Sequence, residues 1–165
     1  MLFRSRVVFD IEDKIENTGN IFEIEQRENY IIRQSVHKSA HGHILAANLD
    51  QAVVIVTLNF PRTSLGFIDR FLVSAESFRI PTIIVFNKID LLSEDEMEHL
   101  LDLRIMYEDI GYPCLFTSAV NQAGIQEFNG ILKDKISLVS GHSGVGKSTL
   151  VNQIAPDLDL KTLEI

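Results

Sequence analysis

The chain has 165 residues, of which 45% are hydrophobic and 23% are charged, and its formal net charge is −8 at pH 7. This length suits one domain, or one domain and part of another, with a substantial hydrophobic core. The acidic balance disfavours a broad basic surface for nucleic acid, and no apolar run reaches the roughly 18–20 residues of a membrane helix. The N-terminus lacks the apolar block of a signal peptide, and the single Cys114 cannot form an internal disulfide. The single cysteine fits a reducing, cytoplasmic setting.

Residues 1–34 are predicted to form short β-strands. Stretches 6–12, 20–26 and 29–34 are rich in β-branched and aromatic residues, and "NTGN" at 17–20 is a turn signal between the first two. Three short strands are too few for a closed barrel. We therefore expect this segment to be part of a small β-domain.

Residues 35–51 are polar and irregular, and we expect a linker there. Its three histidines, His37, His41 and His43, raise the alternative of a metal site. No cysteine or carboxylate cluster nearby completes a ligand set, so a solvated connector is the favoured interpretation.

From residue 52 onward, predicted strands and helices alternate. The strands are expected at 52–58, 82–88, 113–119 and 136–141, and the helices at 64–79, 93–111, 124–134 and from about Lys147. Ser93 and Glu96 form a capping box at the start of the second helix, and Gly111 ends it. The alternation predicts an α/β domain over 52–165 with a mainly parallel sheet and helices on both faces.

A phosphate-binding loop is predicted near the end of the chain. "GHSGVGKS" at 141–148 has the spacing G-x-x-x-x-G-K-[ST] and lies between a predicted strand and a predicted helix. Backbone N–H groups of the loop and the helix N-terminus would face a polyphosphate. Lys147 would reach the β- and γ-phosphates and is the candidate catalytic residue, and Ser148 would coordinate Mg²⁺. The candidate phosphate-binding residues are Gly141, His142, Ser143, Gly144, Val145, Gly146, Lys147, Ser148 and Thr149.

Upstream, Asn87-Lys88-Ile89-Asp90 follows a buried strand and has the chemistry of a guanine reader. The Asp90 carboxylate accepts hydrogen bonds only, and guanine offers two adjacent donors, N1–H and the 2-amino group. Such bonds contribute about 1.5–3 kcal/mol each, so two would favour guanine over adenine ~10²–10⁴-fold. Asn87 would contact the N7 edge and tie this loop to the phosphate loop, and the stem of Lys88 would cover the base.

A third motif follows the next predicted strand, at Thr117-Ser118-Ala119. The backbone N–H of Ala119 would donate to guanine O6. Ser118 and Ala119 therefore complete the candidate guanine-binding set with Asn87, Lys88 and Asp90.

With these motifs in this order, the chain resembles the circularly permuted members of the GTPase superfamily. Among them it looks most like the family of ribosome small subunit-dependent GTPase A, also called RsgA or YjeQ. The resemblance runs over most of residues 20–165 and is carried by "GHSGVGKSTL", "ILAANLDQAVVIV", "RENYIIRQS" and "LKTLEI". Other permuted GTPases typically have a "PNVGKS" loop, and His142-Ser143-Gly144 departs from it.

The resemblance implies an N-terminal OB-type β-barrel, a permuted GTPase domain and a C-terminal zinc-binding domain. It also implies a cytoplasmic GTP-hydrolysing, rRNA-binding factor that binds GTP, GDP and Mg²⁺ and acts late in maturation of the small (30S) ribosomal subunit. This sequence is too short before Gln34 for a full barrel and stops at Ile165, before the switch threonines, a D-x-P-G motif and any zinc ligands. We therefore expect a fragment with guanine-selective binding and little or no turnover. A P-loop ATPase or phosphotransferase, and a non-hydrolysing ribosome-interaction module, remain as alternatives.

Overall fold

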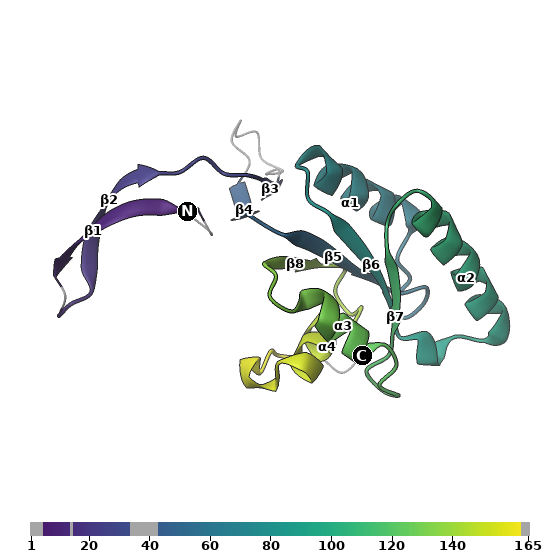
Figure 1. Cartoon of the computed structure of the whole chain (residues 1–165). Coiled ribbons are helices and arrows are strands. Elements are labelled where there is room, and N and C mark those ends of the chain that lie inside the picture. The colour runs from purple at the N-terminus through teal and green to yellow at the C-terminus, as the bar shows by residue number, and fades with distance from the viewer. Residues whose placement is uncertain (1–4, 14, 34–42, 163–165) are drawn as a thin grey trace. The chain divides into compact units, whose positions relative to one another are not determined.

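A computed structural model describes residues 5–13, 15–33 and 43–162. The chain divides into two compact units, Met1–Leu49 and Asp50–Ile165, each of which is described by itself (Figure 1). In the described residues, no helix has both the length and the apolar character needed to cross a membrane.

The described residues of the first unit form two antiparallel strand pairs. Strands β1 (Val7–Asp13) and β2 (Thr18–Ile24) form one pair, and β3 (Tyr30–Arg33) and β4 (His43–Ala47) form the other. All three predicted strands are confirmed. The turn between the first two lies earlier than predicted, because Thr18 and Gly19 already belong to β2 and residues 15–17 form the turn. The Asp13 carboxylate closes it by accepting from the backbone N–H groups of Ile15 and Glu16 at 2.7 and 3.1 Å.

The expectation of an irregular linker over 35–51 is wrong for its second half. Residues 43–47 form β4, which pairs with β3 from Tyr30–Ala47 to Arg33–His43, and Gln51 already belongs to the next strand. The pairing partner β3 ends ten positions before β4 begins, and it supplies backbone hydrogen bonds that the composition of 43–47 does not reveal. His37 and His41 lie outside the described residues, and the side chain of His43 is likewise not described.

The second unit is an α/β domain around a parallel sheet, as predicted. Its strands are β5 (Gln51–Val56), β6 (Thr82–Asn87), β7 (Cys114–Thr117) and β8 (Ser137–Ser140), in the spatial order β7-β6-β5-β8. Its helices are α1 (Leu65–Ser77), α2 (Glu94–Asp109), α3 (Ile125–Leu132) and α4 (Lys147–Ile154), with short 3₁₀ turns η1 (Ile89–Leu91) and η2 (Pro156–Leu158). Each predicted strand and helix of this unit is confirmed, with ends that shift by at most two residues.

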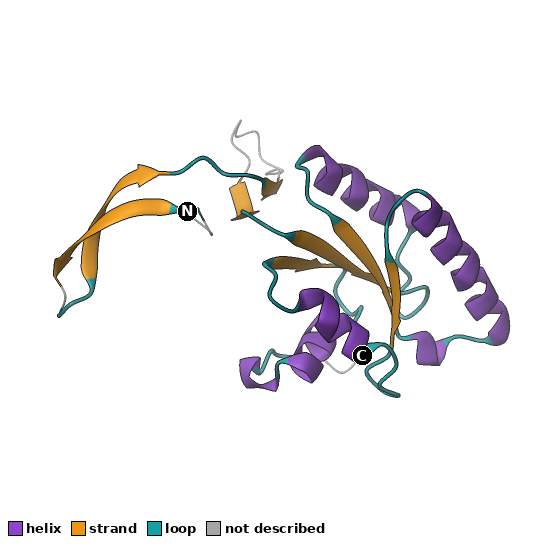
Figure 2. Cartoon of the chain, in the orientation of Figure 1, coloured by secondary structure: helices purple, strands orange, loops and turns teal. Residues whose placement is uncertain are grey.

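Helices lie on both faces of this sheet (Figure 2), and a hydrophobic cluster packs on each face. Alternate residues of β5 divide between them, because successive side chains of a strand point to opposite faces. Val54 and Val56 join the cluster of α1 and α2, whereas Val53 and Ile55 join the cluster of α3 and α4. Burial on both faces explains why this strand is a continuous apolar run. The sheet thereby holds the carboxyl ends of β6, β7 and β8 in a fixed relation.

Helix α2 begins at the predicted capping box. The Ser93 hydroxyl accepts from the Glu96 N–H, and the Glu96 carboxylate accepts from the Ser93 N–H. The helix ends at Asp109, just before Gly111 at φ 95°. Tyr107 of this helix is buried and donates its hydroxyl to Asp69 of α1 at 3.0 Å, so the two helices on this face are joined by a hydrogen bond as well as by packing.

Candidate functional site

The three predicted motifs lie at the same edge of the parallel sheet. Asn87 ends β6, Thr117 ends β7, and the glycine-rich loop follows β8. Parallel strands place their carboxyl ends together, and this edge is where open α/β sheets bind ligands. The structure therefore brings together residues that are up to 61 positions apart, from Asn87 to Ser148.

The glycine-rich loop has the backbone conformation that requires its glycines. Gly141, Gly144 and Gly146 have φ values of 145°, 84° and 92°, a region that L-residues rarely adopt. A Cβ atom on Gly141 would lie 2.2 Å from the carbonyl oxygen of Ile55, so the loop also lies too close to β5 to admit a side chain there. The loop leads directly into α4, which begins at Lys147. Its backbone N–H groups are thus held next to a helix N-terminus.

Lys147 folds back over the loop that precedes it. Its ammonium group donates to the carbonyl oxygens of Gly141 and His142 at 2.9 and 2.6 Å. Burial lowers the pKa of Lys147 from its ordinary value because removal from water disfavours the charged form. A negatively charged ligand in the loop would offset this cost. The imidazole of His142 packs against the Phe67 ring of α1, with ring centroids 3.9 Å apart.

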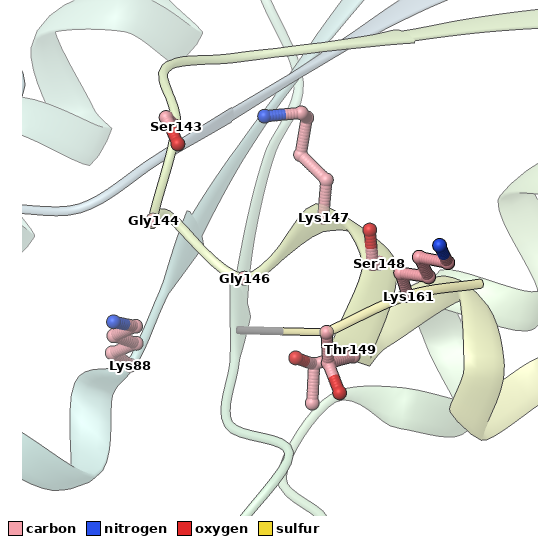
Figure 3. Close-up of a pocket in the computed structure, with 9 residues that line it drawn as sticks. Lys88, Ser143, Gly144, Gly146, Lys147, Ser148, Thr149 and Lys161 are labelled. Carbon is pink, nitrogen blue, oxygen red and sulfur yellow. The ribbon is translucent and has the colours of Figure 1, made fainter. Parts of the chain in front are cut away.

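A pocket of about 210 Å³ opens in front of the loop (Figure 3). Predicted residues supply most of its lining, and three lysines give it positive charge. Lys161 and Thr162, from the segment that follows α4, also line it, although no sequence motif assigns them to the site. The lining residues are Lys88, Ser143, Gly144, Gly146, Lys147, Ser148, Thr149, Lys161 and Thr162.

Val145 belongs to the predicted phosphate-binding set but has a different structural role. Its side chain is completely buried in the core cluster of α3 and α4. Its backbone carbonyl accepts a hydrogen bond of 2.8 Å from Nδ2 of Asn87. Any contact of Val145 with a ligand would therefore come from its backbone N–H.

The side chain of Asn87 connects all three motifs. Nδ2 donates to the phosphate loop at Val145, and Oδ1 accepts from the hydroxyl of Thr117 at 3.0 Å. Asn87 is 5% exposed and Thr117 is completely buried, so these bonds form away from solvent. The predicted tie between the Asn87 loop and the phosphate loop is confirmed.

Lys88 and Asp90 extend from the turn that follows Asn87. Lys88 has a left-handed backbone with φ 62°, and its ammonium group donates to the carbonyl oxygen of Phe60 at 2.7 Å. Asp90 is exposed, and its Oδ1 accepts a hydrogen bond from the hydroxyl of Ser118. A carboxylate has about four acceptor positions, so Asp90 keeps capacity for further donors.

Ser118 and Gln122 hold the neighbouring loop. Ser118 is completely buried, and its Oγ accepts from the N–H groups of Val120 and Asn121 at 3.2 and 3.3 Å. Gln122 donates from Nε2 to the carbonyl oxygen of Ala119 at 2.8 Å. These bonds fix the backbone of Ala119, the predicted donor to guanine O6. The contribution of Gln122 was not predicted, because no motif marks it.

The chemistry of the loop fits Mg²⁺. Ser148 is half-buried, lines the pocket and offers a hydroxyl oxygen. Mg²⁺ takes oxygen ligands and keeps several waters, so one protein oxygen together with phosphate oxygens suffices. In the described ranges, no group of three or more His, Cys, Asp or Glu side chains could hold a metal ion.

Comparison with known proteins identifies relatives of this chain. The family model described as RsgA GTPase matches residues 24–165. Proteins named small ribosomal subunit biogenesis GTPase RsgA from Cytophaga hutchinsonii and Bacteroides fragilis are 58% and 53% identical over 147 and 150 residues, which is 89% and 91% of this chain. The chain spans about half the length of these curated relatives, 48% in both cases.

Solved structures agree with the sequence matches. The crystal structure of YjeQ from Thermotoga maritima aligns over 96% of this chain and 52% of its own, with TM-score 0.78 and 37% identity. The structure of YloQ, described as a circularly permuted GTPase, aligns over 92% of this chain and 49% of its own, with TM-score 0.70 and 33% identity. The chain is therefore similar to both solved structures in sequence as well as in fold.

Proposed function

The chain belongs to the RsgA GTPase family, and from this membership we propose that it binds GTP and GDP as part of a factor for biogenesis of the small ribosomal subunit. GTP hydrolysis is the activity that the names of the relatives state for them. The observation that most supports the proposal is the pair of hydrogen bonds of Asn87, which joins the phosphate loop to the two loops with base-reading chemistry.

The proposed phosphate site consists of the loop 141–146 and the first residues of α4. Loop N–H groups and the helix N-terminus receive the phosphate oxygens. Lys147 exchanges its bonds to the Gly141 and His142 carbonyls for phosphate oxygens, because an anion attracts the ammonium more strongly than two neutral acceptors do. Ser148 holds Mg²⁺, which when bound neutralises charge on the β- and γ-phosphates.

The proposed guanine site consists of Asp90, Lys88 and the loop that Ser118 fixes. Asp90 accepts from N1–H and the 2-amino group of guanine, while the Ser118 hydroxyl keeps its carboxylate oriented. Adenine presents an acceptor at its N1 position and has no 2-amino group, so it would leave the carboxylate without donors. We expect guanine selectivity to depend on Asp90 more than on any other side chain.

The test is calorimetric titration of the 165-residue chain with GDP and with ADP in Mg²⁺, beside Asp90→Asn. We expect GDP to bind at least ~10²-fold more tightly than ADP, since two charge-assisted hydrogen bonds are at stake. Asp90→Asn should lose most of this preference. The matched control is Asp102→Asn, which neutralises an exposed carboxylate on α2 away from the site.

Xanthosine diphosphate separates loss of recognition from loss of folding. Xanthine carries a carbonyl where guanine carries the 2-amino group, and the side-chain amide of the Asp90→Asn variant would donate to that carbonyl while accepting from N1–H. Asp90→Asn should therefore prefer xanthosine diphosphate to GDP. Equal affinities of the unsubstituted chain for GDP and ADP would contradict the guanine assignment and favour a P-loop ATPase or phosphotransferase.

The ribosomal partner, its rRNA and a cytoplasmic location are proposed from the names of the relatives and from the resemblance of the motifs. The net charge of −8 confines any contact with rRNA to local charge placement. Cosedimentation with purified small subunits, with GDP or a non-hydrolysable GTP analogue, tests the partner. Sedimentation without any nucleotide binding would favour a non-hydrolysing interaction module.

A further inference from the structure

The segment after α4 turns back onto this helix and reaches the phosphate pocket. It contains η2, and Asp159 then reverses the chain with a left-handed backbone at φ 41°. Asn152 of α4 holds the returning backbone at Leu160 with two bonds, from Nδ2 to the carbonyl oxygen at 2.8 Å and from the backbone N–H to Oδ1 at 3.0 Å. Because the side-chain amide of Asn152 both donates to and accepts from the backbone of Leu160, it fixes the chain one residue before Lys161.

These two hydrogen bonds at Leu160 place Lys161 at the wall of the pocket. It lines the pocket with Lys88 and Lys147, and all three lysines are labelled in Figure 3. The other two ammonium groups donate to backbone carbonyls, of Phe60 for Lys88 and of Gly141 and His142 for Lys147. Within the described ranges, Lys161 makes no hydrogen bond or ion pair, and its side chain is exposed. Its three donors are therefore available to an anion in the pocket.

We propose that Lys161 is a further phosphate-binding residue, which contacts the phosphates of the bound nucleoside diphosphate or triphosphate, and that Asn152 is the residue that positions it. This inference rests on the proposed function, because it takes a guanine nucleotide as the occupant. The pocket already concentrates donors for an anion, and a compact ammonium group on a flexible stem suits phosphate oxygens. No part of the recognised G-x-x-x-x-G-K-[ST] pattern includes Lys161.

The first experiment compares the unsubstituted chain with Lys161→Gln in displacement of a fluorescent GDP analogue by GDP and by guanosine, in Mg²⁺. Lys161→Gln should weaken GDP about 3- to 10-fold, the range for a partly exposed charge-assisted contact, and should leave guanosine unchanged because it has no phosphate. Lys133→Gln is the matched control. It removes an exposed lysine of the same unit that does not line the pocket. Circular dichroism checks that each variant is folded.

The outcomes separate this inference from the proposed function. Equal GDP affinity for the unsubstituted chain and Lys161→Gln overturns the role of Lys161 and leaves the proposed function standing. An equal loss for GDP and guanosine also overturns it, because the effect would not pass through phosphate. If ADP binds as well as GDP and both weaken in Lys161→Gln, the phosphate contact stands and the guanine assignment fails. If the unsubstituted chain binds neither nucleotide, both fail.

A double-mutant cycle tests the role of Asn152. Asn152→Ala should weaken GDP by a factor similar to Lys161→Gln and leave guanosine unchanged, because it releases the backbone at Leu160. The double variant should bind GDP about as tightly as whichever single variant has the lower affinity, because the two substitutions remove the same contact of Lys161 with phosphate. Additive losses would show that Asn152 acts independently of Lys161 and would overturn its positioning role.

Discussion

Gly146 lies where the phosphate loop packs closely against Asn87 of the base-reading loop. A Cβ atom on Gly146 would lie 2.5 Å from Nδ2 of Asn87, the same atom that donates to Val145. Its φ of 92° is a second constraint, because side chains rarely tolerate that conformation. Gly146 thus has to lack a side chain for two reasons: its own backbone conformation and its closeness to Asn87, which lies 59 positions earlier in the sequence.

Two glycine-to-alanine substitutions should therefore have opposite effects on stability. Gly146→Ala should destabilise the domain by about 1–3 kcal/mol, because it strains the backbone and displaces Asn87 from a buried pair of hydrogen bonds. Gly130→Ala should stabilise it by roughly 0.5–1 kcal/mol. Gly130 lies inside α3, and an added Cβ atom there would meet nothing within 4 Å. Urea denaturation followed by circular dichroism measures both.

GDP affinity distinguishes the two substitutions further. Gly146→Ala should weaken GDP binding at least about tenfold, since the carbonyl of Val145 and the loop N–H groups lose their fixed positions. Gly130→Ala should leave it unchanged. Unaltered stability in Gly146→Ala would show that Asn87 moves without cost and that the link between the loops is dispensable.

Some residues of the site belong to a recognisable sequence motif, and others are identified only by their position in the structure. Gly146 and Lys147 belong to a pattern whose backbone chemistry is local, so the sequence predicted their positions. Lys161 has no such pattern. Its place in the pocket depends on Asn152 and on the chain reversal at Asp159, which become visible only in three dimensions. Gln122 was missed for the same reason, because its bond to Ala119 forms only when the loop is closed.

At the scale of elements, the sequence predicted strands and helices with a clear pattern of burial or capping, and it missed a short strand that follows a polar stretch. Strands β5 and β6 are covered on both faces, and helix α2 begins with a capping box, so their sequences carry the signal. Strand β4 follows a polar stretch and contains only five residues, and its pairing with β3 identifies it. Non-local backbone hydrogen bonds leave little trace in composition.

The capping box of α2 makes part of the stability of this element dependent on pH. The hydrogen bond from the Ser93 backbone lowers the pKa of Glu96 below 4.5, helped by Asn59 and by the Ser93 hydroxyl, and partial desolvation opposes the shift. A carboxylate whose pKa falls on folding stabilises the fold above its unfolded pKa. That contribution is lost as the pH falls through the folded pKa.

Glu96→Gln should therefore lower the free energy of unfolding at pH 7, and the difference from the unsubstituted chain should shrink as the pH falls below about 4.5. Glutamine keeps one acceptor, for the Ser93 N–H, and loses the acceptor for Nδ2 of Asn59, so the substitution removes the charge and one of two hydrogen bonds. Glu98→Gln, on an exposed position of the same helix, is the control and should show little change at either pH. A Glu96→Gln difference that is equal at pH 7 and at pH 3 would mean that the charge contributes nothing.

At the scale of the whole molecule, the two units differ in how their apolar side chains are covered. The second unit has two clusters of buried apolar side chains, in which Ile55, Phe128 and Leu150 are completely buried, although other apolar side chains of this unit are exposed. In the first unit, Phe9, Ile15 and Phe22 are 59%, 92% and 70% exposed. A two-stranded hairpin with few buried side chains is at best marginally stable by itself. We expect β1 and β2 to open far more often than the sheet of the second unit.

Hydrogen exchange followed by mass spectrometry tests this division and its link to ligand binding. All residues that line the pocket belong to the second unit, so GDP should slow exchange in 82–90, 117–124 and 137–149. Residues 7–24 should exchange quickly with or without GDP, since their hydrogen bonds are exposed and no ligand contact stabilises them. ADP at the same concentration is the control and should protect much less. Protection of 7–24 by GDP would mean that nucleotide binding is coupled to the first unit, and the nucleotide site would then have to be treated as a property of both units.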